Sequence, residues 1–250
     1  MTKYVRFEVD GRAGYGIVEG NTIRELDKSY FEQFSVTSET FDLDKVRLLS
    51  PTEPSKIVCV GLTYASQAEE SRMEFPAEPS LFVKRSTAVI GPGEPVVYPD
   101  MPERVEFGAE LAVVIGKTAH NIEPEDADEY IFGYTCLTDL SPHDLGHEEP
   151  TAKSIDTTRP VGPWIVDNVD DPNRLDIDST VNEEARQHVN TDQLSFDVQH
   201  LVSLASKMTT LNAGDVIAIG APPGAGPVEP GDVMEVRIQN VGCLKNPVKR

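Results

Sequence analysis

The first fifty residues alternate between apolar and polar positions in short runs. Such alternation is typical of β-strands with one buried face, because successive side chains of an extended chain point to opposite faces. Turn residues separate the runs and predict a small N-terminal β domain, with strands at residues 4–9, 15–20 and 22–26. Pro51 and Pro54 then interrupt regular structure. We therefore expect two domains, residues 1–50 and residues 51–250.

The rest of the chain consists of apolar runs bounded by Gly- and Pro-containing turns. These runs predict the main strands, at residues 56–61, 80–84, 109–116, 130–140, 163–166, 215–220 and 232–238. A helical period predicts an amphipathic helix over residues 195–208 with Ser195 as its N-cap, and residues 64–73 predict a shorter helix. Strands dominate and do not alternate regularly with helices, which indicates a strand-dominated α+β fold.

The segment RVEFGAELAVVIG places two carboxylates at the start of a strongly apolar strand. Positions 106, 108 and 110 share one face of an extended chain, so Glu106 and Glu110 flank Gly108, which has no side chain. Acids on an inner face are costly unless a positive group meets them. Asp139 and Lys153 are polar groups near the ends of other apolar runs. The pattern is compatible with a hard divalent cation, with an internal ion-pair network, or with exposed acids.

The composition and net charge mainly exclude certain classes of binding partner. The 250 residues include 42 acidic and 22 basic side chains, a formal net charge of −20, which argues against nucleic acids and anionic membranes. The acids are spread along the chain, as on surfaces adapted to high salt. No apolar run approaches a membrane span and no signal peptide is apparent, so we expect a cytoplasmic protein. The three separated cysteines are expected to be reduced.

Several segments, taken in order, resemble motifs of the fumarylacetoacetate hydrolase superfamily. They cover most of the chain from about residue 56 to residue 248. The matching segments include KIVCVGLTYASQAEE, VEFGAELAVVIGK, GYTCLTDLSPHDL, KSIDTTRPVGPWIV, LNAGDVIAIGAPPGAG and PVEPGDVMEVRIQNVGCLKNPV. The resemblance implies a mixed β-roll or barrel catalytic domain, a homodimer, and a small 2-oxo acid or β-dicarbonyl compound as substrate.

The same resemblance implies roles for individual residues. Glu110 and Asp139 match two of the three carboxylates that hold one Mg²⁺ or Mn²⁺ in this superfamily. Glu70 matches the acid of a His–Glu pair that activates water, and Lys153 matches a lysine that neutralises substrate charge. Lys84 matches a lysine of its segment that is expected to contact the substrate. Such a metal ion would stabilise an enolate by binding two substrate oxygens.

Six positions depart from the superfamily pattern, among them Thr63, which replaces the usual Asn, and Gly146, which replaces a Gln that helps to hold the substrate. Gly108 stands where the first metal-binding Glu is expected, and Gln67 stands at the catalytic His. His143 replaces a substrate-binding Arg, and Ala221 replaces a Thr that supplies a hydroxyl. An amide can orient water but cannot accept its proton, and loss of a general base typically slows a reaction by about 10²- to 10⁴-fold.

The remaining residues offer partial substitutes for the lost groups. Glu106 lies on the same strand face as Glu110 and could reach the metal ion, or could form a surface ion pair instead. His143 and the nearby His147 could form an alternative metal site with Asp139, or could be surface side chains. Lys153 could contact substrate or form an ion pair with an orphaned acid.

Two hypotheses follow from these departures. The first is a metal-dependent enzyme of the superfamily, for which the loss of the His favours lyase or isomerase chemistry over hydrolysis. The second is a non-catalytic member that kept the fold and lost the site. Fold does not fix function, so the choice depends on the geometry around Glu110 and Asp139.

Overall fold

The computed structural model describes residues 1–100, 104–142 and 155–250. Its N-terminal strands are β1 (Lys3–Val9), β2 (Arg12–Glu19), β3 (Thr22–Leu26), β4 (Val36–Asp42) and β5 (Arg47–Leu48). The strands that follow are β6 (Lys56–Gly61), β7 (Ser80–Arg85), β8 (Val89–Ile90), β9 (Val96–Val97), β10 (Val105–Ile115), β11 (Ile131–Pro142), β12 (Arg159–Val166), β13 (Asp176–Val181), β14 (Glu184–Asn190), β15 (Val216–Ala218), β16 (Gly226–Val228), β17 (Val233–Ile238) and β18 (Gly242–Lys249). The helices are α1 (Ala65–Glu70) and α2 (Val198–Met208), with short 3₁₀ helices η1 (Leu43–Lys45), η2 (Ser86–Ala88), η3 (Pro124–Glu129) and η4 (Thr191–Gln193).

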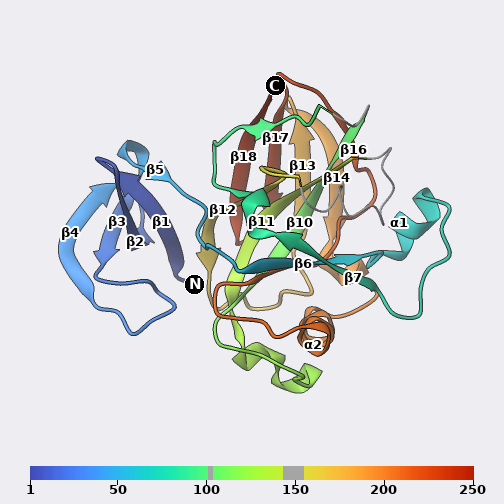
Figure 1. Cartoon of the computed structure of the whole chain (residues 1–250), viewed down its shortest axis with the longest axis horizontal. Helices are drawn as coiled ribbons and strands as arrows, with labels where there is room; N and C mark the ends of the chain where they lie inside the picture. Colours follow the sequence, from blue (N-terminus) through green and yellow to red (C-terminus); the bar gives the residue numbers. More distant parts are fainter. Residues whose placement is uncertain (101–103, 143–154) are drawn as a thin grey trace.

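Two sheets organise the molecule (Figure 1). The larger has the strand order β4-β3-β2-β1-β12-β11-β10-β15-β6-β7, and β5, β8 and β16 pair with strands of this path. The smaller has the order β14-β13-β17-β18-β9. The prediction of a strand-dominated α+β fold is therefore confirmed.

The N-terminal strands extend the larger sheet. The predicted strands at residues 4–9, 15–20 and 22–26 correspond to β1, β2 and β3, and Val5, Phe7 and Ile23 form a small core of their own. β1 also pairs with β12, with Lys3 opposite Val166. The separate lobe in Figure 1 is therefore joined to the rest of the molecule by backbone hydrogen bonds as well as by the chain.

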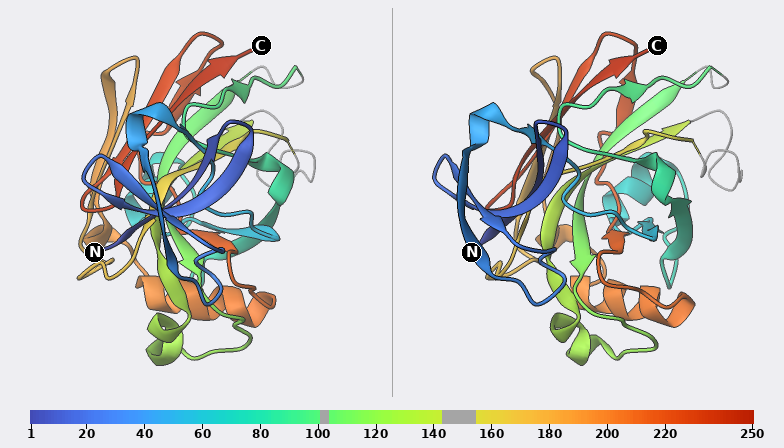
Figure 2. Two further views of the ribbon diagram at one scale, coloured as in Figure 1. Left: turned by 90° about the vertical axis from the view of Figure 1, so that its left-hand side faces the viewer. Right: turned by 60° about the vertical axis from the view of Figure 1, so that its left-hand side comes forward.

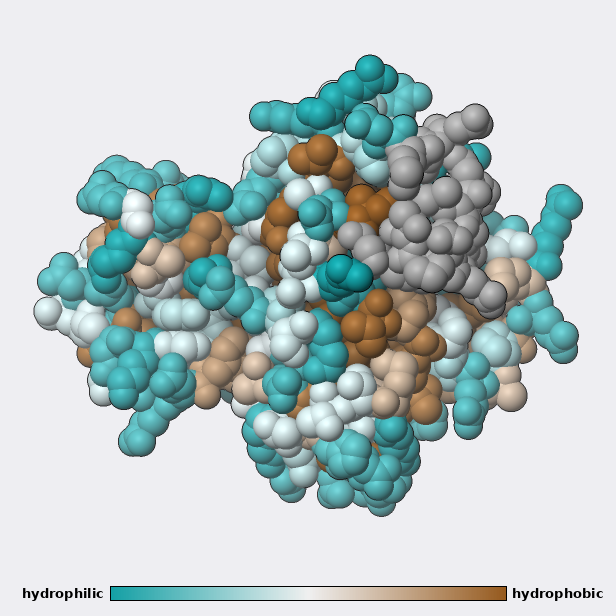
Figure 3. Space-filling view, in the orientation of Figure 1, coloured by the Kyte–Doolittle hydropathy of each residue, from teal (hydrophilic) through white to brown (hydrophobic). Residues whose placement is uncertain are grey.

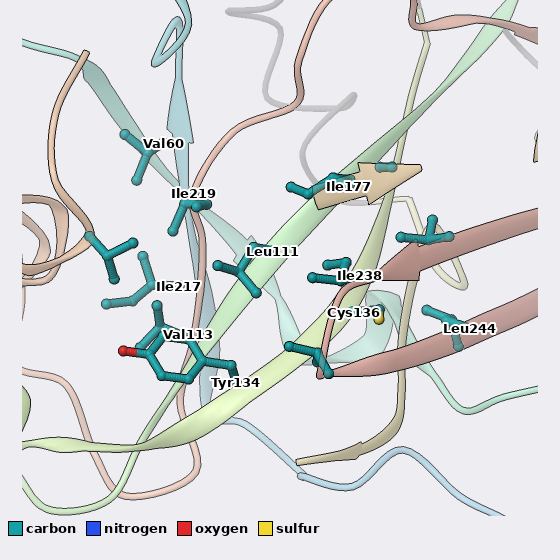
Figure 4. Close-up of a cluster of buried hydrophobic side chains, with 14 of the residues drawn as sticks. Val60, Leu111, Val113, Tyr134, Cys136, Ile177, Ile217, Ile219, Ile238 and Leu244 are labelled. Atoms are coloured by element: carbon teal, nitrogen blue, oxygen red, sulfur yellow. The ribbon is translucent and has the colours of Figure 1, made fainter. Parts of the chain in front are cut away.

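β10 lies at the centre of the molecule, and this explains its apolar sequence. All of its residues from Phe107 to Ile115 are buried, so alternation gives way to a continuous apolar run. Leu111 and Val113 pack in one core between the two sheets, whereas Ala112 and Val114 pack in a second core on the opposite face. Figure 4 shows side chains from both sheets meeting in the first of these cores.

Strands of the smaller sheet have one buried face, as their sequences show. Buried and partly buried residues alternate strictly along β13. β13 and β14 form a hairpin whose turn residues, Asn182 and Glu183, both have positive φ, at 51° and 69°. Because Glu is an unusual residue for a left-handed conformation, this hairpin was not predicted from the sequence.

The helices begin later than their sequences predicted. α2 starts at Val198 rather than Ser195, and the backbone N–H of Val198 donates to Asn173 Oδ1 at 2.8 Å. The N-cap prediction for Ser195 is therefore wrong, because an amide 25 residues upstream caps the helix instead. α1 ends at Glu70, since Arg72 has a positive φ of 54°. Figure 2 shows α2 and η3 side by side at one end of the molecule.

The surface and the cysteines agree with the composition. Hydrophilic residues cover most of the outer parts of the face shown in Figure 3. Cys59 and Cys136 are buried, Cys243 is half-buried, and all three are free thiols, as predicted. Within residues 1–100, 104–142 and 155–250, no helix is long and apolar enough to cross a membrane.

Candidate active site

The acidic face predicted for β10 exists. In the antiparallel pairing with β11, Gly108 lies directly opposite Asp139 and Glu106 lies opposite Ser141. Glu110 is two residues further along the same face, so it is the diagonal neighbour of Asp139. The expected convergence of residues 110 and 139 is therefore what the strand register produces.

Glu110 is buried, and no cationic side chain within residues 1–100, 104–142 and 155–250 forms an ion pair with it. It is 3% exposed, and its Oε2 accepts a 2.7 Å hydrogen bond from the backbone N–H of Gly220. Burial raises the pKa of Glu110 well above its ordinary range, and the neighbouring negative charge of Asp139 raises it further. The carboxyl group of Glu110 therefore holds its proton more tightly than an exposed glutamate does.

Asp139, by contrast, meets two buried cationic side chains. Arg159 Nη2 lies 2.6 Å from Asp139 Oδ1, and Lys84 Nζ lies 3.3 Å from the same oxygen. Ser141 Oγ donates to that oxygen as well, at 2.7 Å. Arg159 is 0% exposed and Lys84 is 1% exposed, so both charges are removed from water. The site is thus an ion-pair network around one carboxylate.

Arg159 was not identified as a site residue from the sequence. It is the first residue of β12, and the strand predicted there began four residues later, at Pro163. Its only signal is a basic residue at the start of an apolar run, and a buried Arg at such a position requires an anion. Only the pairing of β12 with β11 brings it to Asp139.

The loop after β15 fills the space beside Gly108. A Cβ atom placed on Gly108 would lie 2.8 Å from the Cβ of Ala221. This loop is held by Gln187, whose Nε2 donates to Pro222 O at 2.8 Å while its Oε1 accepts from Ala109 N at 2.9 Å. The position of the missing Glu is therefore closed by the same residue, Ala221, that stands at the expected Thr.

The segment before and within α1 contributes buried polar atoms. The side-chain oxygens of Thr63, Tyr64 and Gln67 are buried and have no hydrogen-bond partner among the described residues. Burial raises the pKa of Tyr64, and so does the charge of Glu110. Glu70 is exposed and accepts a hydrogen bond from the backbone N–H of Gly224 at 3.1–3.2 Å. Buried polar atoms normally have partners, so this segment has the character of a binding site for a polar ligand or water.

The other predicted site residues lie elsewhere or outside the described part. Glu106 Oε1 lies 2.7 Å from Arg104 Nη2 at the entrance of the strand. His143 and Lys153 fall in residues 143–154, outside the described residues, as does His147. The structure therefore brings together Glu110, Asp139 and Lys84.

The chemistry of this site can be tested against the divalent metal ion that the resemblance implies. Glu110 and Asp139 offer the hard oxygen ligands that Mg²⁺ and Mn²⁺ prefer. In the described part of the chain, however, no three His, Cys, Asp or Glu residues form a group that could hold a metal ion. Lys84 and Arg159 already contact Asp139. The described residues do not fit a resident divalent ion, and Mg²⁺ or Mn²⁺ stays a prediction from the resemblance.

Comparison with known proteins finds relatives that share this fold and most of the sequence length. The mitochondrial oxaloacetate tautomerase fahd2 of Xenopus laevis is 39% identical over 218 residues, which are 81% of this chain and 68% of that protein. The structure of a 2-hydroxyhepta-2,4-diene-1,7-dioate isomerase from Mycobacterium marinum is 35% identical with a TM-score of 0.92, covering 100% of this chain and 99% of that one. A maleylpyruvate hydrolase from Sphingobium sp. SYK-6, solved with manganese(II) and pyruvate, is 30% identical with a TM-score of 0.83, covering 99% and 98%.

Family models match nearly the whole chain. A model described as Rv2993c-like, N-terminal, matches residues 2–51. A model described as fumarylacetoacetate (FAA) hydrolase C-terminal matches residues 56–249, which contain β6 to β18 and every residue of the site described above. With the order of the sequence motifs and the fold in agreement with these matches, the chain belongs to the fumarylacetoacetate hydrolase family.

Proposed function

We propose that this protein is an enzyme that isomerises or tautomerises a small 2-oxo acid or β-dicarbonyl compound through an enol or enolate. The observation that carries the proposal is the buried pair Glu110 and Asp139, with the ammonium group of Lys84 beside it. Catalysis of this class needs a proton carrier and a positive group at the developing oxyanion. Both kinds of group meet at one end of β10 and β11.

The two carboxylates have different surroundings, which supports different roles. Asp139 contacts two cationic groups, whereas Glu110 accepts a backbone hydrogen bond from Gly220 and has a pKa raised by burial and by Asp139. Neighbouring acids in unlike environments are a common arrangement for proton transfer. In this proposal Glu110 carries the proton that moves between carbon and oxygen, and Lys84 stabilises the negative charge on the substrate oxygen.

The segment at residues 63–67 supports a binding place for the substrate. Thr63, Tyr64 and Gln67 present buried oxygens without partners among the described residues. Thr63 adjoins Gly220, since a Cβ on Gly220 would clash with Thr63 Oγ1, and the backbone N–H of Gly220 donates to Glu110. Oxygens of a small acid would supply hydrogen-bond partners there. Lys153, as the resemblance suggests, would neutralise the substrate carboxylate.

Gln67 favours isomerisation over hydrolysis. Hydrolysis requires a base that takes a proton from water, and the amide of Gln67 cannot do so. Glu70 accepts a backbone hydrogen bond from Gly224. Among the relatives named above, one is a tautomerase and one an isomerase. The related hydrolase was solved with manganese and pyruvate.

The setting of the enzyme is also proposed from charge and resemblance. A net charge of −20 disfavours binding to nucleic acids and to anionic membranes. The resemblance supports a homodimer in the cytoplasm, with a high-salt interior as one explanation for the acidic surface.

A second candidate is a non-catalytic binding protein. It is favoured by Gly108, Gln67 and Ala221, three altered positions around one site. Such a protein would bind a small acid through Lys84 without turning it over.

An assay of enol-oxaloacetate ketonisation, monitored by the loss of the enol's ultraviolet absorbance, tests the proposal. We expect the wild-type protein to accelerate the reaction above the spontaneous rate. Lys84→Met should lower kcat/KM by about 10²- to 10³-fold, as loss of a charge-stabilising group does. Lys117→Met is the matched control, because Lys117 is an exposed lysine that contacts Glu129, and it should leave the rate unchanged.

The following outcomes would contradict the proposal that the protein is an enzyme. No acceleration of oxaloacetate tautomerisation or decarboxylation, or of acylpyruvate hydrolysis, would reject catalysis of this class. If oxalate nevertheless raised the melting temperature of the wild type and not of Lys84→Met, the non-catalytic binding protein would be the correct function.

A further inference from the structure

Among residues 1–100, 104–142 and 155–250, positive side chains already compensate the two acids of the site without a divalent cation. Two carboxylates, Glu110 and Asp139, face two cationic side chains, Lys84 and Arg159. All four are largely or fully removed from water: Asp139, at 15% side-chain exposure, is the most accessible of them. With all four groups ionised their formal charges cancel, and with Glu110 protonated, the form that its burial favours, the group has one net positive charge. In either state a divalent ion added to this group would leave at least two uncompensated positive charges in a buried site, where charges are poorly screened.

Arg159 is fixed in place and cannot be neutralised. Its Nη1 donates to the backbone oxygens of Leu140 and Thr158, at 2.6 Å and 2.5 Å. An arginine stays protonated in proteins, and at 0% exposure it needs an anion close by. Asp139 Oδ1, 2.6 Å from Nη2, provides that anion. The negative charge of Asp139 is therefore committed to the guanidinium group.

The neighbouring positions that the structure describes add no further carboxylate to the pair. Gly108 has no side chain, and Ala221 closes the space that one would occupy. The carboxylate of Glu106 lies against Arg104. Glu110 Oε2 is turned to the backbone N–H of Gly220. Within the described residues, position 108 thus carries no acid, while a buried cation at position 159 contacts Asp139.

We propose that Arg159 takes the electrostatic place of a divalent metal ion, so that Glu110 and Asp139 bind neither Mg²⁺ nor Mn²⁺ at millimolar concentrations. The proposal concerns the resting protein. It does not depend on the proposed enolisation, because metal binding is measured without substrate. Removing the charge of Arg159 therefore creates a metal site where none exists in the wild type.

Binding of Mn²⁺ to the full chain tests this directly. Free Mn²⁺ gives a sharp electron paramagnetic resonance spectrum that broadens on binding, so titration in high KCl measures bound metal. Because the acidic surface attracts cations, the quantity of interest is the difference between the wild type and Glu110→Gln, which lacks one carboxylate of the pair. We expect the two titrations to coincide.

Arg159→Met should behave differently. Removing a positive charge a few ångströms from the carboxylates should tighten Mn²⁺ binding by about 100-fold or more relative to the wild type. Arg159→Lys keeps a positive charge and should not gain the site. Arg104→Met is the matched control, because Arg104 pairs with Glu106 on the same face and its loss changes the net charge equally.

Three results would overturn the proposal. The first is a millimolar or tighter site in the wild type that Glu110→Gln abolishes. The second is a folded Arg159→Met protein, checked by circular dichroism, that binds no more Mn²⁺ than the wild type. The third is equal tightening by Arg104→Met. If Arg159→Met does not fold, the comparison of wild type with Glu110→Gln decides the question alone.

Discussion

Substitution of Gly108 by alanine tests whether steric contact explains why position 108 does not carry the glutamate expected from the superfamily pattern. A Cβ at this position would lie 2.8 Å from the Cβ of Ala221, closer than real Cβ atoms approach one another. The obstacle is not the far end of a flexible side chain. The loop that carries Ala221 is tied to β14 through Gln187 and Pro222. Relief of the contact therefore requires β10 or the loop to move.

The expected magnitude follows from two opposing effects. Overpacking a filled interior typically costs about 1–3 kcal/mol, whereas replacing glycine by alanine within a strand gains about 0.5–1 kcal/mol from reduced backbone freedom. We expect Gly108→Ala to lower the free energy of unfolding by about 1–2 kcal/mol. For a chain of this size that corresponds to a melting temperature about 2–8 °C lower.

A double-mutant cycle isolates the contact. In an Ala221→Gly background the Cβ added by Gly108→Ala meets Asp139 O at an ordinary 3.9 Å, so the change should be neutral or slightly stabilising. The coupling energy should be about 1–3 kcal/mol. Equilibrium urea unfolding of the four proteins in one high-salt buffer measures it, with unchanged m-values as the check on two-state behaviour.

Gly226→Ala is the matched control. Gly226 lies in β16, and a Cβ there would meet only Arg186 Nη1, at an ordinary 3.7 Å. This substitution should be neutral or slightly stabilising in either background. If Gly108→Ala proves as harmless as Gly226→Ala, the close approach of Ala221 is not real. The steric account of the missing glutamate would then be refuted.

Three further predictions concern the same framework. Glu110→Gln should raise the free energy of unfolding at neutral pH relative to the wild type. The raised pKa of Glu110 favours the folded state at low pH, and this stabilisation is lost as the pH rises through the folded-state pKa, whereas glutamine does not titrate. Thermal melting of both proteins from about pH 4 to pH 8 measures the difference. Gln187→Leu should lower the free energy of unfolding by about 2–4 kcal/mol, since Ala109 N and Pro222 O would be left unpaired in the interior. Asp215→Ala should lower it by about 3–5 kcal/mol, because the fully buried Asp215 pairs with Lys56 Nζ at 2.5 Å and accepts backbone hydrogen bonds from Ser55 and Asn212; urea unfolding measures both changes.

Each of these has a contrary result. A parallel pH profile for Glu110→Gln and the wild type would mean that Glu110 ionises normally. Gln187→Leu with wild-type stability would mean that water replaces the lost amide. For Asp215→Ala, the control is Glu129→Ala, which removes an exposed partner of Lys117 and should change stability by less than about 1 kcal/mol; equal effects would contradict a structural role for Asp215.

The local pattern of the chain determined much of the fold. Alternation fixed the first three strands and placed residues 106, 108 and 110 on one face of β10. The continuous apolar run fixed β10 as a central strand. Motif order identified the family, and with it Glu110 and Asp139 as a pair. These features could be predicted because side-chain direction in a strand repeats every two residues and is a property of the segment itself.

The tertiary structure alone decided how that pair is compensated. Arg159 reaches Asp139 because β12 pairs with β11, and Asn173 caps α2 from a distant loop. Ala221 closes the space beside Gly108 although the two are far apart in the sequence. No periodicity encodes such contacts, since they depend on which strands become neighbours and in which register. The sequence by itself therefore determined that two buried acids meet, and only the folded chain decided which positive charges meet them.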